Sequence, residues 1–156
     1  MALELSTIGM SVGYAAESTA GTRPTTGYTV IPEVKSIPAI GSDVNAIQST
    51  PLSEAFHTYV QGVKGGDGAI GLTVNDCPTF RTAWDALLTA YATAAASSKE
   101  IWFEFKYPTG AGAMESFFLT GKPVELGYGG AEVDAVVENT ANILPSGGFV
   151  WATAST

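Results

Sequence analysis

The sequence predicts a mainly β protein, an antiparallel β-sandwich or barrel with one flanking α-helix at about residues 79–96. Seven or eight short segments are rich in β-branched and aromatic residues, and glycine- or proline-containing turns separate them. One segment alone has the three- and four-residue apolar spacing of a helix. Strands are expected on both sides of this helix without βαβ alternation, which favours a sandwich or barrel over a parallel sheet.

The N-terminal residues 1–25 are rich in glycine, alanine, serine and threonine and show no apolar period. They are predicted to form a flexible N-terminal arm. Residues 26–156 are predicted to form one β-sandwich domain, because a chain of 156 residues fits a single domain of common size.

The first part of this domain contains two short extended runs, residues 26–31 and 34–37. Pro32 and Pro38 interrupt them, which is typical of a sheet edge or a bulge. Residues 38–54 are predicted to form a long polar loop. Loops longer than about 12 to 15 residues are uncommon in compact domains and tend to be functional, so this loop is a candidate contact segment.

Residues 56–61 and 69–74 are predicted strands that flank a glycine-rich turn. The helix follows, with Asp76 expected to cap its N-terminus and Pro78 suited to its first turn. Apolar residues recur at helical spacing as far as about residue 96. The helical side chains predicted to face the core are Phe80, Trp84, Leu87 and Tyr91.

Residues 101–107 show the clearest strand alternation of the chain. Phe103 and Phe105 are predicted core residues on one face, and Glu104 and Lys106 share the other face. Residues 114–120 are expected to return as the hairpin partner. Because both faces of that strand are partly apolar, it is expected to be covered on both sides, by the core and by a neighbour.

Residues 124–128 and 132–138 are the last two strands predicted before the C-terminal tail. In the second, Val133 and Val137 are predicted to face the core. The other face would carry an acidic stripe made by Glu132, Asp134 and Glu138. A solvated strand face explains such a stripe in ordinary terms. The more specific hypothesis is a wall that repels a polyanion, by Coulomb repulsion that salt screens beyond about 8 to 10 Å.

The composition is 46% hydrophobic and only 14% charged, with a net charge of −8. So few charges imply apolar surface that is buried in a core and also in contacts between subunits. The seven lysines and arginines are scattered singly. Proteins that bind nucleic acid usually carry a basic patch, so this pattern argues against such a function.

The sequence contains no recognisable catalytic or metal-binding pattern. His57 is the single histidine and Cys77 the single cysteine, and no G-x-S-x-G elbow or zinc-ligand spacing occurs. Glu104 and Glu115 could face each other as a carboxylate pair, but an ordinary charge pair between Glu104 and Lys106 is favoured. The sequence therefore predicts no enzyme activity, no cofactor and no metal.

Targeting signals are also not recognised. The first ten residues lack the basic and apolar regions of a signal peptide, and no run of about 18 apolar residues occurs. The expectation is a protein made in a cytoplasm, without a membrane partner.

Two stretches and the order of the elements after them resemble the major tail tube proteins of long, non-contractile-tailed (siphovirus-type) bacteriophages. The stretches are Ile31-Pro-Glu-Val-Lys-Ser-Ile-Pro38 and Thr58-Tyr-Val-Gln-Gly-Val-Lys-Gly-Gly-Asp-Gly68. A strand, a helix centred on Trp84, an aromatic strand and a closing segment that ends in Pro-Ser-Gly follow in the same order. The resemblance covers roughly residues 28–150.

The resemblance implies two packed antiparallel sheets with a flanking helix, in a structural virion protein. Members of this family form six-membered rings that stack into a tail tube around a tape measure protein, between initiator and terminator proteins, and DNA later passes through without specific binding. Carried over to this chain, the arm at residues 1–25 and the loop at 40–55 would bridge rings. The assembly would take place in the cytoplasm of a bacterial host, and the acidic stripe would face the lumen.

Two alternatives stay open on the residues alone. One is a monomeric β-sandwich binding or adhesion module for carbohydrate or protein, with Trp102 or Trp151 as an exposed aromatic platform. The other is a small hydrolase that uses His57 or paired carboxylates. The resemblance favours the tube subunit over both.

Overall fold

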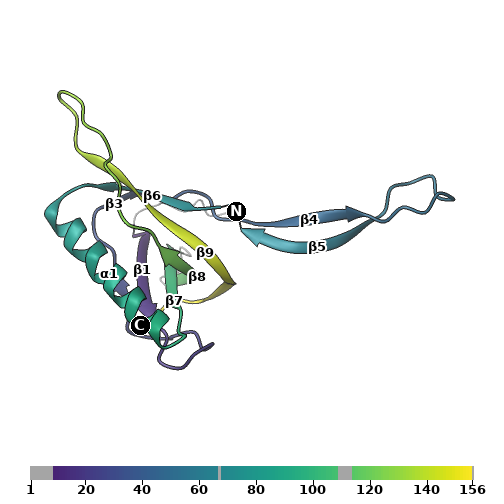
Figure 1. Cartoon of the computed structure of the whole chain (residues 1–156), viewed down its shortest axis with the longest axis horizontal. Helices are drawn as coiled ribbons and strands as arrows, with labels where there is room; N and C mark the ends of the chain where they lie inside the picture. The colour runs from purple at the N-terminus through teal and green to yellow at the C-terminus, as the bar shows by residue number, and fades with distance from the viewer. Residues whose placement is uncertain (1–8, 67, 109–113, 156) are drawn as a thin grey trace, which may run out of the picture.

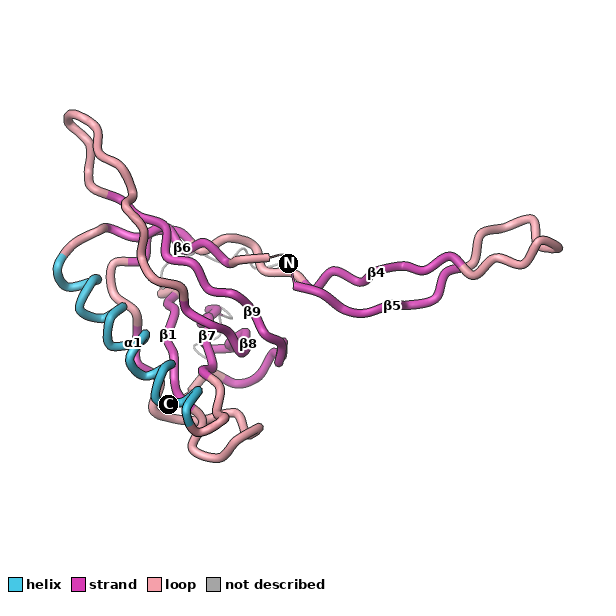
Figure 2. Tube along the Cα trace, viewed as in Figure 1, coloured by secondary structure: helices cyan, strands magenta, loops and turns pink. Residues whose placement is uncertain are grey.

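A computed structural model describes residues 9–66, 68–108 and 114–155, and it confirms a mainly β fold with a flanking helix (Figures 1 and 2). Seven antiparallel strands form one curled sheet, a half-barrel, and two more strands form a separate hairpin. The elements in chain order are β1 (Ser11–Ala16), β2 (Thr29–Val30), β3 (Val34–Ser36), β4 (Ser42–Gln48), β5 (Tyr59–Gly66), β6 (Ile70–Asn75), α1 (Pro78–Ala96), β7 (Ile101–Pro108), β8 (Met114–Pro123) and β9 (Glu138–Thr153).

The strand order in the large sheet is β2-β1-β7-β8-β9-β6-β3, so its two edge strands are neighbours in the sequence. The link between them is short. Ile31 donates its N–H to the Val12 carbonyl at 2.8 Å, and Asn75 donates its N–H to the Glu33 carbonyl at 3.0 Å. Glu33 has φ +62°, a left-handed conformation that lets the chain change direction. Residues 29–36 therefore bridge the gap between the two edges of the half-barrel.

The helix α1 packs against the sheet and closes the main core. Phe80, Trp84 and Leu87 are fully buried, and the Phe80 and Trp84 rings stack with centroids 5.8 Å apart. Each such side chain stabilises the fold by about 1.5–3 kcal/mol relative to exposure. The N-cap is Cys77 without a side-chain hydrogen bond, so the prediction that Asp76 caps the helix is wrong.

Most of the predicted core residues lie in this core. Phe103 is fully buried on β7, Phe105 is buried, and Tyr91 is half-buried against the same cluster. The assignment of Val133 and Val137 to the core is wrong. Val133 is 91% exposed and Val137 is half-exposed, because residues 124–137 form an irregular segment and no strand.

The outer face of β8 is covered by the chain's own residues 17–28. The Arg23 guanidinium lies 4.2 Å from the centroid of the buried Phe118 ring, and the Tyr28 ring lies 5.7 Å from it. The strand is therefore covered on both sides, and on its outer face the neighbour is a segment of the same chain.

The first strand also corrects the predicted arm at residues 1–25. Strand β1 lies between β2 and β7, and Val12 is fully buried. Glu17 at its end accepts hydrogen bonds from the Trp102 indole (2.9 Å) and the Gly21 N–H (3.0 Å). Part of the predicted arm is thus core structure, and residues 1–8 lie outside the described residues.

The predicted loop at residues 38–54 is half of a β-hairpin. β4 pairs with β5 from Ser42↔Gly66 to Gln48↔Tyr59, and Figure 1 shows this hairpin projecting away from the body of the molecule. The loop prediction is therefore wrong for residues 42–48. The segment was missed because it has no core-facing apolar period.

The last strand, β9, bends sharply where the predicted C-terminal tail contains two glycines. Gly147 has φ +139° and Gly148 φ +69°, and a Cβ on Gly148 would meet the Trp102 ring at 2.8 Å. Only glycine fits this approach of backbone to indole. The strand pairs with β6 from Glu138 to Ile143 and with β8 from Ile143 to Thr153, so the bend lies within the part that pairs with β8, where the register shifts.

Among the described residues, no helix is long and apolar enough to span a membrane.

Candidate functional site

The β4–β5 hairpin is exposed over its described side chains. Every residue from Ala46 to Gln61 is exposed except Thr50, which is half-buried. Ile47 and Val60 lie opposite each other on one face, and Tyr59 lies on the other face opposite Gln48. At the tip, Phe56 is 83% exposed and Leu52 is fully exposed. The hairpin thus offers five large apolar side chains to solvent.

Polar contacts hold the tip of the hairpin in shape. The Thr58 N–H donates to Thr50 Oγ1 at 3.0 Å, and the Ser49 N–H donates to the Thr58 carbonyl at 2.9 Å. Gln48 Nε2 lies 2.6 Å from His57 Nδ1. His57 therefore takes part in a local contact of the hairpin, and the structure brings no carboxylate to its ring within hydrogen-bond distance among the described residues.

A projecting hairpin of this composition is not expected to be stable alone. An isolated two-stranded hairpin is marginally stable in water, and the outer edges of both strands lack a described pairing strand. Large exposed apolar patches mark surfaces that contact another molecule. The arrangement can therefore bind a protein surface, through its apolar faces and its free edges.

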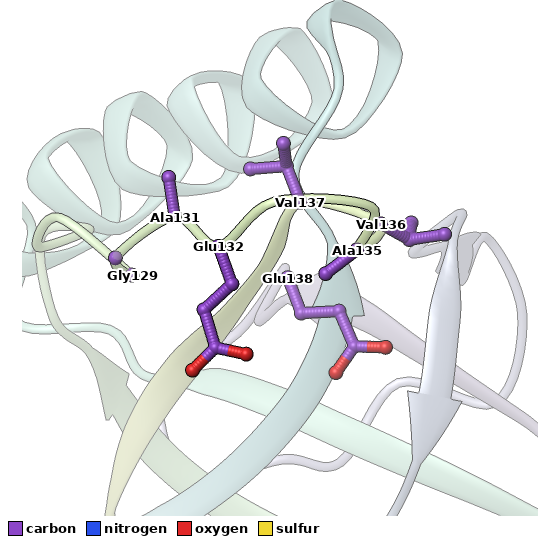
Figure 3. Close-up of a pocket in the computed structure, with 8 residues that line it drawn as sticks. Gly129, Ala131, Glu132, Ala135, Val136, Val137 and Glu138 are labelled. Atoms are coloured by element: carbon purple, nitrogen blue, oxygen red, sulfur yellow. The ribbon is translucent and has the colours of Figure 1, made fainter.

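The acidic residues predicted to form a strand face lie elsewhere. Glu132 and Asp134 are in the irregular segment 124–137, and Asp134 has φ +58° in a turn, so the predicted strand 132–138 is wrong. Glu138 begins β9 and forms an ion pair with Lys35 of β3. In Figure 3 the carboxylates of Glu132 and Glu138 point to the same side of the segment. These two acids still share one surface, although no strand aligns them.

The base of segment 124–137 is fastened to the body. The Trp84 indole donates to the Val124 carbonyl at 2.9 Å, and Asn139 Nδ2 donates to the Gly127 carbonyl at 2.8 Å. A Cβ on Gly129 would lie 2.2 Å from the Glu138 carbonyl oxygen. These contacts hold the first part of the segment against α1 and β9. The tip beyond them exposes Val133 and Val136, a second apolar surface.

Asp76 forms the best-defined ion pair of the described chain. Its carboxylate accepts hydrogen bonds from Arg81 Nε at 2.5 Å and Nη2 at 2.8 Å, and from Asn139 Nδ2 at 3.4 Å. The Arg81 hydrogen bonds hold the pKa of Asp76 below its ordinary value. The ion pair lies at the start of α1, and the Asn139 hydrogen bond connects it to the start of β9.

Glu104 is a buried carboxylate on the outer face of β7. Its Oε1 accepts a hydrogen bond from Ser116 Oγ at 3.1 Å and lies 3.7 Å from Lys106 Nζ. Glu115 lies opposite Tyr107 in the register, whereas Glu104 lies opposite Phe118, so the two glutamates are on opposite faces of the sheet. The structure does not bring together the carboxylate pair that a glycosidase would need.

The remaining candidate residues lie apart from one another. Trp102 is buried beside Glu17, so it offers no exposed platform, whereas Trp151 is 58% exposed with its ring 5.9 Å from that of Tyr107. Cys77 is half-buried at the start of α1. Within the described ranges, no cluster of three or more His, Cys, Asp and Glu residues is placed to hold a metal ion.

Leu52 and Phe56 are the functional candidates that the sequence did not single out. They stand within and just beyond the segment predicted as a polar loop. Two large apolar residues among the mostly polar residues 48–58 were the available signal. They have no periodicity with their neighbours, and so they predict neither a strand face nor a helix face.

No family model matches this chain, and no curated protein matches its sequence. Its fold is shared by solved structures of larger assemblies, including the following two. A chain in the cryo-EM structure of the anti-feeding prophage (AFP) baseplate, 6-fold symmetrised, has a TM-score of 0.69 and 11% identity, with all of both chains covered. A chain in the tail of an empty GTA particle, computed with helical refinement and C6 symmetry, has a TM-score of 0.57 and 9% identity, over 92% of this chain and 96% of that one. The curled sheet, flanking helix and projecting hairpin therefore make up a fold found in a prophage baseplate and in a GTA tail.

Proposed function

We propose that this chain is a structural subunit of a bacteriophage tail that self-assembles into stacked six-membered rings, which form a tube for DNA delivery. The observation that carries the proposal is the β4–β5 hairpin, with Phe56 83% exposed at a tip far from the core. An exposed apolar surface of this kind marks a site of contact with another molecule. A second copy of the same chain can bury this surface if the hairpin extends onto it.

The likeness of fold supports this assignment. The two structures described above are a baseplate and a tail, and both assemblies have sixfold symmetry. A hairpin that contacts a different surface on the next copy makes a heterologous contact. Contacts of that kind build rings when the rotation closes and filaments when it does not. A tube of stacked rings needs contacts that close within each ring and contacts that repeat from ring to ring.

The charge of the chain suits a conduit for DNA. The net charge is −8, and the lysines and arginines do not gather in one stretch of the sequence. A tube wall of this kind repels phosphates, so DNA passes without specific binding. The other partners proposed are a tape measure protein and the tail initiator and terminator proteins, within a virion assembled in a bacterial cytoplasm. The role is structural and not enzymatic.

The acidic residues at segment 124–137 are proposed to face the lumen of the tube. The test replaces Glu132 with Lys and Asp134 with Asn and leaves Glu138 in place, because Glu138 pairs with Lys35. Tubes are expected to form, with DNA ejection impaired. The control is Asp85→Lys, on the exposed side of α1. Normal DNA ejection by particles that carry the double variant would contradict the proposal that Glu132 and Asp134 face the lumen.

The hairpin's role in assembly is tested with a Leu52→Ser, Phe56→Ser double variant. Both side chains are exposed and outside the core, so the melting temperature is expected to stay within about 1–2 °C of the unmodified chain. Sedimentation velocity is expected to show assembly of the unmodified chain and its loss in the variant. A Thr89→Ser, Thr93→Ser control on the exposed helix face should assemble normally. Equal assembly of all three chains would refute the role of the hairpin.

A binding or adhesion module is the second candidate. The exposed Trp151 beside Tyr107 is the kind of aromatic surface that such a module uses. A glycan-binding screen that yields clear hits, from a chain that stays monomeric when concentrated, would favour it over the tube subunit.

A further inference from the structure

Strand β9 has a neighbour on both sides for only part of its length. It pairs with β6 from Glu138 to Ile143, and with β8 from Ile143 to Thr153. From residue 144 onward, no described strand pairs with its second side. The N–H and C=O groups that point outward along this side form a template for another strand.

This edge lacks the usual protection. Natural edge strands carry charges, prolines or bulges that prevent pairing with another chain. No charged residue occurs from residue 139 to the end of the chain. Pro145 and the Gly147–Gly148 bend occupy the first part of the free edge. Residues 149–153, Phe-Val-Trp-Ala-Thr, contain neither charge nor proline and are rich in residues that favour strands.

Both faces of the sheet at this edge are apolar and partly exposed. Trp151 is 58% exposed on the face it shares with the half-buried Phe149, and its ring lies 5.3 Å from that of Phe117. Val150 is exposed on the opposite face. A strand added here would therefore find apolar side chains on either side of its backbone.

The hairpin has the complementary features. Its outer edges have no described partner strand, and its exposed residues are apolar on both faces, with Ile47 and Val60 on one and Tyr59 on the other. When a strand extends a sheet, its side chains lie beside those of the neighbouring strand, within about 4.5–5.5 Å. The Ile47–Val60 pair can then cover the exposed Trp151, and Tyr59 can lie on the face of Val150.

We propose that residues 149–153 of β9 accept the β4–β5 hairpin of a second copy of this chain, which extends the sheet across the subunit boundary. The inference rests on the proposed self-assembly and identifies its acceptor surface. The charge pattern agrees with it, because an edge without charge adds no repulsion between two copies that each carry −8. The contact joins two different surfaces, so it propagates from copy to copy.

Cross-linking between two differently tagged chains tests the proposal, in a Cys77→Ser background that removes the single native cysteine. One chain carries Gln48→Cys or Val60→Cys in the hairpin, and the other carries Ala152→Cys in β9. A short bis-maleimide is added after co-assembly, since it tolerates an unknown register. The matched control replaces the hairpin cysteine by Thr89→Cys on the exposed face of α1. The expected result is a heterodimer for a hairpin position with Ala152→Cys, at least tenfold above the control.

A second variant measures the same contact without a cross-linker. Val150→Lys places a charge on the free edge, and it should lower the assembled fraction at least fivefold relative to Thr89→Lys at equal melting temperature. Tubes that form without a heterodimer, and equally well with Val150→Lys, would overturn the acceptor edge while the proposed function stands. An unmodified chain that never assembles would contradict the proposed function, and the inference with it.

Discussion

The indole N–H of Trp84 donates a hydrogen bond to the main-chain oxygen of Val124, at 2.9 Å. Trp84 is fully buried in α1, and Val124 is the first residue after β8. The helix therefore stabilises the core and also fixes the point where the irregular segment 124–137 leaves the sheet. This hydrogen bond thus connects the buried core to the exposed segment 124–137.

The first prediction concerns this bond. Trp84→Phe removes the donor and leaves a small cavity, so it should lower the free energy of unfolding by about 1–3 kcal/mol. Urea denaturation followed by circular dichroism measures the change. Tyr128→Phe, at an exposed aromatic position of the same segment, is the control and should have no effect. An unchanged midpoint for Trp84→Phe would contradict the structural role of the bond.

The second prediction concerns two nearby glycines. A Cβ at Gly129 would clash with the Glu138 carbonyl oxygen at 2.2 Å, whereas a Cβ at Gly127 would meet no heavy atom within 4 Å. Gly129→Ala should therefore destabilise the protein by about 1–3 kcal/mol, and Gly127→Ala should be close to neutral. Thermal unfolding of the two variants makes the comparison. Equal melting temperatures would show that segment 124–137 does not lie against β9 as described.

The third prediction is a pH dependence at Asp76. Because the Arg81 hydrogen bonds lower the pKa of Asp76 in the folded state, the stability that they contribute is present above the unfolded pKa, about 3.9. It is lost as the pH falls through the lower, folded pKa. Asp76→Asn should reduce the melting temperature at pH 7, and the difference should shrink below about pH 4. Glu132→Gln, an exposed position, is the control. A difference that stays constant from pH 7 to pH 3 would rule out this linkage.

The fourth prediction concerns Tyr28, which covers the outer face of β8. Burial raises the pKa of its hydroxyl from 10.0 to about 12, although the Arg23 charge acts in the opposite direction. The unfolded chain thus loses this proton at lower pH than the folded chain, and stability falls as the pH rises from about 10 towards 12. In Tyr28→Phe this alkaline loss should be smaller, as measured by thermal unfolding between pH 8 and 11. A loss as steep as that of the unmodified chain would exclude Tyr28 as a contributor.

The elements predicted correctly from the sequence are those with a strong period and a core to face. The helix carries Phe80, Trp84 and Leu87 at helical spacing, and all three are buried. In β7 the alternation of Phe103 and Phe105 with polar residues matches the two faces of the sheet. In these segments the side chains that face the main core recur with the period of the helix or the strand, so the order of residues predicts the structure.

The errors fall where no core imposes a period, or where an apparent period misleads. From residue 46 to residue 61, where burial is described, the hairpin has no buried side chain, and residues 42–48 carry no apolar period that would predict a strand. Residues 132–138 alternate valine and acid, yet Asp134 takes a turn conformation and the valines stay exposed. The first strand consists mostly of small residues, and its position is set by Val12 and by pairing with β2 and β7. These positions depend on contacts between residues far apart in sequence.

Electron microscopy of the purified, concentrated protein tests the central claim most directly. Negative-stain images at increasing concentration, with and without a tail initiator, are expected to show sixfold rings and stacked tubes. The Leu52→Ser, Phe56→Ser variant is expected to show neither. Monomers at every concentration, in both conditions, would contradict a self-assembling tail subunit.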